Sequence, residues 1–208
     1  MYKSQNNEIE VVLNYFSGKK EKKTVLSIGE NDGVTFSNSY DLIQSGWDAH
    51  LIEPSPKAFD KLKKVHEGNE RVHIYNFGIY TKTGTFVFNE SGSYYNQGED
   101  VALLSCLIDS EKERWGNKVA FEKVNAYFVT FDDFIKGITE PVFDFITIDA
   151  EGLDFEILQQ IDLKKYGCQC LCIEHNGIND MIQRITSYCS GYNMRQLSMN
   201  PENLIFGL

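Results

Sequence analysis

The 208-residue chain lacks the features that mark membrane, secreted or repetitive proteins. It has no apolar run of the about 18 residues that a membrane-spanning helix needs. Its first residues show no basic stretch followed by an apolar segment and a cleavage site. With only 4 prolines and no repeat, no linker divides it. These absences favour a single domain over residues 1–208, a cytoplasmic location and no contact with a membrane.

Basic residues are also scarce. The chain has 20 Lys and Arg against 30 Asp and Glu, which gives a formal net charge of -10. A chain of this charge repels a phosphate backbone and gains little from the release of counterions. We therefore expect no nucleic-acid partner.

The five cysteines are an odd number, and three of them, Cys168, Cys170 and Cys172, alternate along one apolar run. Alternate residues of a strand share one face, where neighbours do not suit a mutual disulfide. A zinc site lacks a fourth ligand nearby. The pattern predicts reduced, buried thiols on one face of a strand.

Apolar runs and helical patterns alternate along the chain. The spacing of Ile9, Val12 and Phe16 predicts a leading helix within residues 1–23. Strands are predicted at 24–28, 49–52, 71–77, 85–89, 124–129, 143–148, 168–173, 194–198 and 204–206. Helices are predicted at 36–44, after Ser55 and Thr130, at 154–161 and at 178–189. This order predicts an α/β fold with a doubly wound, mostly parallel sheet.

One interval after the third strand breaks the alternation. Residues 90–123 are polar and glycine-rich, and we expect them to form an insertion over the sheet edge. Long loops of this kind often form lids or binding loops, so the insertion is predicted to line a binding pocket. Its aromatic residues Tyr94, Tyr95, Trp115 and Phe121 could stack on a ligand, although such residues more often pack the loop itself.

The first predicted strand ends in a glycine-bounded turn, Gly29-Glu30-Asn31-Asp32-Gly33. Glycines permit the tight turn and a close approach of the backbone to a ligand. Glu53 ends the next strand, where a carboxylate can accept both hydroxyls of a ribose. The two features together predict a site for a nucleoside cofactor.

The turn does not suit a dinucleotide. A pyrophosphate site asks for G-x-G-x-x-G, but Asn31 and Val34 stand where the second and third glycines belong. Glu30 and Asp32 would also repel phosphate, whereas they favour a cofactor with sulfonium and ammonium groups. The turn therefore favours S-adenosylmethionine over NAD.

Six blocks in this order resemble the FkbM family of S-adenosylmethionine-dependent methyltransferases. They are SIGENDGV, SNS, GW, IEPSP, IDAEG and IEHN, at residues 27–34, 37–39, 46–47, 52–56, 148–152 and 173–176. The resemblance covers residues 24–192. It implies a class I methyltransferase fold, which is Rossmann-like, and methylation of a hydroxyl oxygen.

The resemblance also implies which residues surround the cofactor. They are Gly29, Asn31 and Gly33 at the methionine part, Glu53 at the ribose, and Phe77 and Gly78 at the adenine edge. The family usually has an acidic residue where this chain has Ser27. Glu30 is the acid that could compensate in binding the amino end of the cofactor.

Polar residues follow two later strands. Asp149 and Glu151 come after the strand at 143–148, and Glu174 and His175 come after the next one. Because the carboxyl ends of parallel strands meet at one edge, these side chains should lie close together. The ordinary pKa of histidine is near neutrality, so we predict His175 as the base that removes the acceptor proton, with Asp149 and Glu151 as further catalytic residues.

Each of these residues also has a structural interpretation. His175 could instead orient the loop that follows it, and Asp149 and Glu151 could stabilise the start of a helix. Asp149, Glu174 and His175 together also suit a divalent metal ion, which would lower the pKa of an acceptor hydroxyl.

The sequence thus predicts an S-adenosylmethionine-dependent methyltransferase that acts on a hydroxyl of a sugar, glycan or small natural product. Two alternatives remain. One is a non-catalytic nucleoside-binding or interaction domain, since no base is unambiguous. The other is an NAD-linked oxidoreductase.

Overall fold

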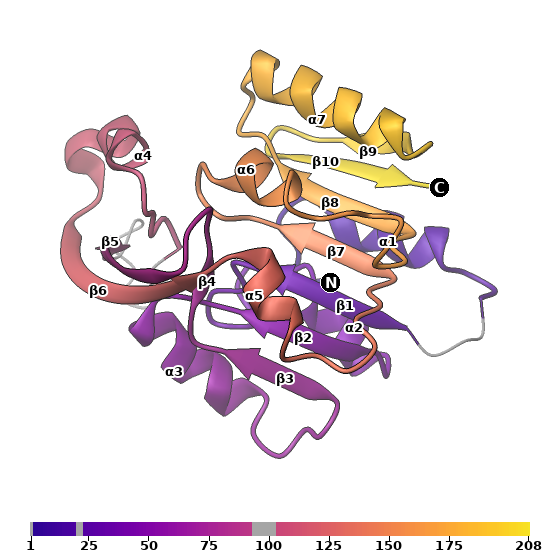
Figure 1. Cartoon of the computed structure of the whole chain (residues 1–208), viewed down its shortest axis with the longest axis horizontal. Coiled ribbons are helices and arrows are strands. Elements are labelled where there is room, and N and C mark those ends of the chain that lie inside the picture. Colours follow the sequence, from indigo (N-terminus) through magenta and orange to yellow (C-terminus); the bar gives the residue numbers. More distant parts are fainter. Residues whose placement is uncertain (1, 20–22, 93–102) are drawn as a thin grey trace.

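The computed structural model describes residues 2–19, 23–92 and 103–208, and its centre is a seven-stranded sheet (Figure 1). In spatial order the strands are β3 (Val72–Tyr75), β2 (Asp48–Ile52), β1 (Thr24–Ile28), β7 (Phe145–Ile148), β8 (Cys170–Glu174), β10 (Asn203–Gly207) and β9 (Arg195–Met199). The pairs from β3 to β8 are parallel, and β10 and β9 are antiparallel to their neighbours. The predicted mostly parallel sheet is confirmed.

Helices cover both faces of this sheet, so an apolar core lies against each face. One core lies under α1 (Glu8–Tyr15), α2 (Tyr40–Gln44) and α3 (Pro56–Val65). The other lies under α5 (Phe131–Ile135), α6 (Asp154–Leu158) and α7 (Asn179–Gly191). Successive residues of β1 point to opposite faces, so Val25 packs in the first core and Leu26 in the second. Within the described ranges, no helix has the length and apolar character needed to cross a membrane.

Two helix starts follow the predicted caps. The Ala58 N–H donates to the Ser55 hydroxyl at the start of α3 (3.2 Å), and the Asp133 N–H donates to the Thr130 hydroxyl at the start of α5 (3.2 Å). Each cap satisfies a backbone N–H that the first helical turn leaves without a partner. The helix predicted from residue 36 begins only at Tyr40, because Phe36 has a left-handed backbone (φ +57°).

The cysteines are all free and buried, but the predicted shared face is wrong. Strand β8 begins at Cys170, so Cys168 precedes it and packs in the core under α6 and α7. Cys170 and Cys172 point to the opposite face, toward α1.

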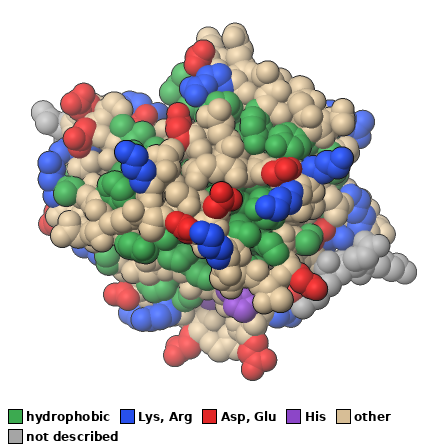
Figure 2. Space-filling model, in the orientation of Figure 1, with side chains coloured by type: hydrophobic (Ala, Val, Ile, Leu, Met, Phe, Trp, Pro, Cys, Tyr) green, Lys and Arg blue, Asp and Glu red, His purple; other side chains and the backbone are tan. Residues whose placement is uncertain are grey.

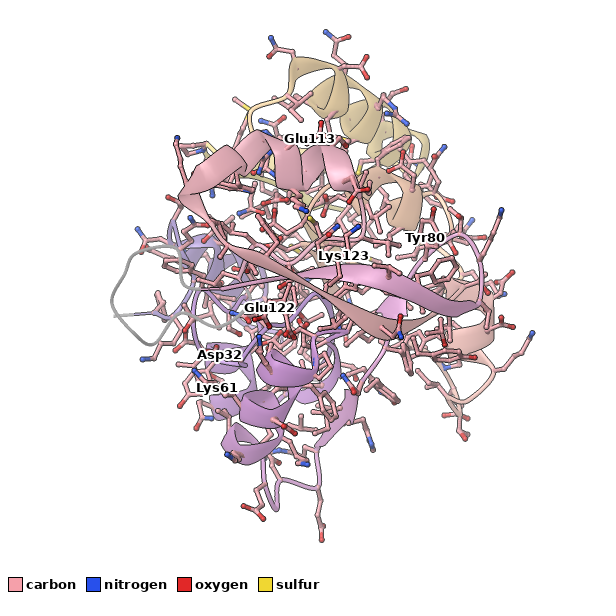
Figure 3. All side chains as sticks on the ribbon, turned by 90° about the vertical axis from the view of Figure 1, so that its left-hand side faces the viewer. Asp32, Lys61, Tyr80, Glu113, Glu122 and Lys123 are labelled. Carbon is pink, nitrogen blue, oxygen red and sulfur yellow. The ribbon has the colours of Figure 1, made fainter. Side chains whose placement is uncertain are left out.

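A smaller sheet stands beside the main one and is built from β4 (Gly78–Ile79), β6 (Phe121–Val129) and β5 (Gly84–Ser91), in that order. Figure 3 shows β6 crossing this side of the molecule, between α4 (Asp109–Trp115) and α3. A short 3-10 helix (Gly116–Lys118) follows α4.

Strands β5 and β6 extend into both ends of the predicted 90–123 insertion. The irregular part of the insertion is therefore shorter than expected. The insertion leaves at Gly92 and returns at Ala120, where the Gly92 N–H donates to the Ala120 carbonyl (2.8 Å). Tyr94 and Tyr95 lie outside the described residues.

Candidate active site

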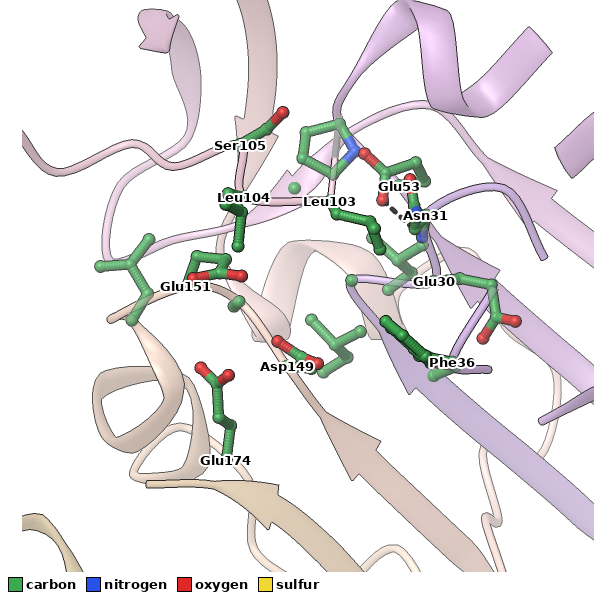
Figure 4. Close-up of a pocket in the computed structure, with 18 of the residues that line it drawn as sticks. Glu30, Asn31, Phe36, Glu53, Leu103, Leu104, Ser105, Asp149, Glu151 and Glu174 are labelled. Carbon is green, nitrogen blue, oxygen red and sulfur yellow. Dashed lines mark hydrogen bonds between the residues drawn. The ribbon is translucent and has the colours of Figure 1, made fainter. Parts of the chain in front are cut away.

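A cavity of about 360 Å³ opens at the carboxyl ends of β1, β2, β7 and β8 (Figure 4). The turn after β1 forms one wall, and the acidic residues after β7 and β8 form the floor. The insertion supplies Leu103, Leu104, Leu107, Arg114 and Trp115 as a further wall. This volume is above the lower limit of about 300 Å³ that is typical of small-ligand pockets in other proteins, so the cavity is large enough for such a ligand.

The turn after β1 has a backbone that only glycine fits at two positions. Gly29 has φ +84°, and a Cβ there would lie 1.7 Å from the carbonyl oxygen of Asp149. Gly33 has φ +81°, and its Cβ would lie 2.7 Å from Leu62 Cδ1. Asn31 between them is also left-handed (φ +56°), which asparagine tolerates better than most residues. The turn can thus pass close to the end of β7 and present its backbone to the cavity.

Glu53 at the end of β2 is held beneath this turn. Its Oε2 accepts from the Asn31 N–H (2.8 Å), and its Oε1 accepts from the Ser55 N–H (2.7 Å). Burial raises the pKa of Glu53 to about 7, although these two hydrogen bonds oppose the rise. Each carboxylate oxygen keeps a further lone pair that could accept from a ligand hydroxyl.

Two polar side chains of the turn differ in their hydrogen bonding. The Glu30 carboxylate is buried and accepts from the hydroxyls of Ser37 (2.6 Å) and Ser39 (2.8 Å). Burial raises the pKa of Glu30, while hydrogen bonds from Ser27, Ser37 and Ser39 oppose that rise. In contrast, the side-chain oxygen and nitrogen of Asn31 are buried without a partner among the described residues. The Asn31 amide is therefore available to a ligand, whereas Glu30 is committed to its own loop.

Of the pair predicted at the adenine edge, only Gly78 lines the cavity. A Cβ on Gly78 would lie 2.2 Å from the ring of Phe128, so glycine lets β4 pass close to β6. Phe77 packs instead against Tyr75 and Phe134, with ring centroids 5.5 and 6.0 Å away.

Carboxyl groups gather on the floor of the cavity. Asp149 and Glu174 line the cavity, and Glu151 lies beside them (Figure 4). Asp149 and Glu174 each place an oxygen within 4.8 Å of the other and of an oxygen of the buried Asp154. Burial raises the pKa of Asp149 to about 6 and that of Asp154 to about 7, and repulsion from neighbouring acids adds to both. The same two causes raise the pKa of Glu151 and Glu174 well above the ordinary value.

Two residues in or next to this floor were not predicted as part of the site. Asp154, expected only as the start of a helix, accepts from the N–H groups of Ala150 (2.8 Å) and Gly152 (3.1 Å). Arg114 on α4 lies 3.9 Å from Glu151 and 3.2 Å from Glu111. The spacing in IDAEGLD could have suggested Asp154, but nothing local in the sequence brings Arg114 to the end of β7.

The structure does not bring His175 to the cavity, so its expected place beside Asp149 and Glu174 is wrong. Its Nδ1 accepts from the Gly177 N–H (2.9 Å), and its Nε2 donates to the carbonyl oxygen of Asn200 (3.2 Å). Both ring nitrogens are occupied, the residue is 4% exposed, and it is not among the described residues that line the cavity. These contacts match the alternative interpretation of a loop-orienting histidine.

Comparison with known proteins identifies the class of fold. The methyltransferase domain of METTL16 (crystal form 2) is 13% identical and superposes with a TM-score of 0.53 over 96% of this chain and 65% of that one. The human methyltransferase 10 domain containing protein is 13% identical, with a TM-score of 0.50 over 96% of this chain and 79% of that one. The chain thus spans just under two thirds of the first of these. Curated protein sequences give no match.

These similarities and the cavity at the strand ends define a class I methyltransferase fold. The family model described as the methyltransferase FkbM domain matches residues 27–197. The chain therefore belongs to the FkbM methyltransferase family, and its cofactor is S-adenosylmethionine. The unpartnered Asn31 amide, the Glu53 carboxylate and the cavity volume fit a cofactor of this kind. The predicted family, fold and cofactor are confirmed.

Proposed function

We propose that the chain methylates a hydroxyl oxygen of a neutral small molecule or glycan, with the carboxylates of Asp149 and Glu151 as acceptors of the hydroxyl proton. The observation that carries this proposal is the position of Asp149. Its backbone packs on Gly29 of the cofactor turn, and its side chain belongs to the acidic floor. Donor and proton acceptor therefore meet at one point of the cavity.

The cofactor residues follow from the same geometry. Gly29 and Asn31 would face the methionine part, with the free Asn31 amide as the polar contact, whereas Gly33 lies against Leu62 and is not among the described residues that line the cavity. Glu53 would accept from the ribose hydroxyls, and Gly78 would lie against the adenine. When bound, the cofactor supplies an activated methyl carbon on a sulfonium.

The residues of the chain then have two tasks. They hold the acceptor oxygen in line with the methyl carbon and the sulfur, because methyl transfer is an in-line displacement. They also take the proton as the new O–C bond forms and the S–C bond breaks, which leaves a methyl ether and S-adenosylhomocysteine. Asp149 and Glu151 stand where a hydroxyl that enters from the insertion side would meet both.

The charge of the cavity supports a neutral acceptor. The carboxyl groups of Asp149, Glu151 and Glu174 line the cavity, and the cationic Arg114 that also lines it is paired with Glu111, so a phosphate or carboxylate on the acceptor would be repelled. Leu103, Leu104 and Phe128 offer an apolar wall for the carbon face of a sugar or a ring. On the face drawn in Figure 2, Lys and Arg side chains are interspersed with Asp and Glu and form no basic track for a phosphate backbone.

A labelled-methyl transfer assay tests the proposal. The panel contains neutral glycosides, phenols, sugar phosphates and RNA, and the variants are Asp149→Asn, Glu151→Gln and the exposed control Asp180→Asn. We expect transfer to a neutral hydroxyl, a loss of about 10²-fold or more in at least one of the two site variants, and no change in the control. Binding of S-adenosylhomocysteine, followed by thermal shift, should persist in all three. Transfer only to RNA, or full activity in both site variants, would contradict the proposal.

A further inference from the structure

The carboxylates of Asp149, Asp154 and Glu174 converge from three elements of the fold. Asp149 follows β7, Asp154 begins α6 and Glu174 ends β8. One oxygen of each lies within 4.8 Å of the others. Mg²⁺ and Ca²⁺ hold oxygen ligands at about 2.0 to 2.6 Å, so oxygens on one ion are separated by at most about 4 to 5 Å. The spacing therefore matches ligands that share a single ion.

Glu174 supplies a second, independent observation. Its side chain is 6% exposed, yet its Oε2 has no hydrogen-bond partner among the described residues. Figure 4 shows the Glu174 carboxylate directed between Asp149 and Glu151, toward the cavity. A buried carboxylate oxygen without a partner is costly, so Glu174 Oε2 is a ready ligand for a cation at this point.

The charge of the floor leads to the same conclusion. Four carboxyl groups are gathered here, and the cationic side chain of Arg114 is 3.9 Å from Glu151 and is closer to Glu111. Like charges in a buried site are tolerated only when they bind protons or a cation. A divalent ion would neutralise two of these charges.

The ligand chemistry selects the type of ion. All three converging groups are carboxylates, and hard oxygen ligands favour Mg²⁺, Mn²⁺ or Ca²⁺ over metals that prefer nitrogen or sulfur. The Ala150 and Gly152 N–H groups orient the Asp154 carboxylate and leave a lone pair on each oxygen. Backbone contacts therefore hold the Asp154 carboxylate in place.

We infer that Asp149, Asp154 and Glu174 form a binding site for a divalent cation such as Mg²⁺ or Mn²⁺ on the floor of the cavity. Three protein ligands leave coordination positions open toward the cavity, where acceptor hydroxyls can bind. With Asp149 engaged by the ion, Glu151 is the carboxylate left to take the hydroxyl proton. This last role rests on the proposed function, whereas the binding of the ion does not.

A titration of the full chain with Mn²⁺ tests the inference. The electron paramagnetic resonance signal of free Mn²⁺ measures how much of the ion is bound. We expect saturable binding that Mg²⁺ displaces and that Glu174→Gln weakens at least tenfold. Asp180→Asn, whose side chain is 79% exposed, is the matched acidic control and should leave the affinity unchanged. The variant Asp154→Asn is a weaker test, because it could unfold the turn that Asp154 stabilises. Glu174→Gln avoids this problem, because Glu174 Oε2 makes no hydrogen bond to the described residues.

Two outcomes overturn the cation site: no saturable binding of Mn²⁺, or binding that Glu174→Gln does not change. Methyl transfer after treatment with EDTA separates this inference from the proposed function. Transfer that continues while Mn²⁺ fails to bind overturns the cation site alone. Saturable binding sensitive to Glu174→Gln, without transfer to any acceptor, supports the cation site and contradicts the proposed function.

Discussion

Gly29 at the end of β1 and Asp149 at the end of β7 are in backbone contact, since a Cβ on Gly29 would lie 1.7 Å from the Asp149 carbonyl oxygen. The cofactor turn and the acidic floor are therefore fixed to each other through the main chain. A change at Gly29 must move one of them.

Gly29→Ala should lower both stability and cofactor binding. The added methyl group meets backbone, which cannot rotate away, and the left-handed conformation adds a further cost, so we expect a loss of several kcal/mol. Gly46→Ala is the matched control, because Gly46 also has a positive φ (+98°) but no atom within 4 Å of its Cβ. That variant should cost about 1 kcal/mol and leave cofactor binding intact. Thermal unfolding and titration with S-adenosylhomocysteine measure both effects, and equal losses in the two variants would contradict this account.

Glu53→Gln should weaken binding of S-adenosylhomocysteine by roughly 10- to 100-fold. Glutamine has one acceptor oxygen where the carboxylate has two, and its NH₂ group would face either the Asn31 or the Ser55 N–H. Calorimetry measures the affinity, with Asp60→Asn on the exposed side of α3 as the control. An unchanged affinity would remove Glu53 from the nucleoside site.

Glu53 should also make stability depend on pH. Burial raises its folded pKa from 4.5 to about 7, so between these values the folded state holds a proton that the unfolded state has lost. Its stabilising contribution is thus full below about pH 4.5 and disappears as the pH rises through 7, a change of roughly 3 kcal/mol at about 1.4 kcal/mol per pKa unit. Thermal unfolding from pH 5 to pH 8 should show this decline in the wild type and a smaller one in Glu53→Gln. A parallel decline in both proteins would show that other groups cause it.

His175→Gln should affect stability rather than chemistry. The ring joins the Gly177 N–H to the Asn200 carbonyl, so its loss loosens the connection between β8 and α7 and lowers the melting temperature. The pH profile of methyl transfer should keep its shape, because His175 is not among the described residues that line the cavity. Loss of an ionisation from that profile would restore His175 as the base.

Arg114→Gln should strengthen the binding of Mn²⁺ several-fold. The guanidinium near Glu151 repels a cation on the acidic floor, and its removal leaves the three proposed ligands untouched. Arg184→Gln, on the exposed side of α7, is the control of the same charge. Weaker binding in Arg114→Gln would mean that Arg114 supports the site rather than opposing it.

The sequence predicts the features that depend on local chemistry. The turn after β1, the caps at Ser55 and Thr130 and the acids after β7 all follow from residues close together in the chain. The features it does not predict depend on distant partners. His175 is held by Asn200, and Arg114 reaches Glu151 only because the insertion folds back over the cavity.

The predicted start of the second helix at residue 36 is wrong for a similar reason. The buried Glu30 carboxylate needs donors, and the hydroxyls of Ser37 and Ser39 reach it because the chain turns at Phe36 before α2 begins. Helical periodicity alone cannot show that a buried carboxylate in a neighbouring loop needs these hydroxyls as hydrogen-bond donors.

The hydrogen bond between Gly92 and Ala120 has a consequence for how acceptor preference can change. Because the ends of the insertion are neighbours on adjacent strands, closing a longer or shorter segment between them costs little additional entropy. A segment of another sequence and length can therefore replace this one while the sheet and the cofactor turn keep their geometry. Transplanting residues 93–119 between members of the family is a direct route to new acceptors.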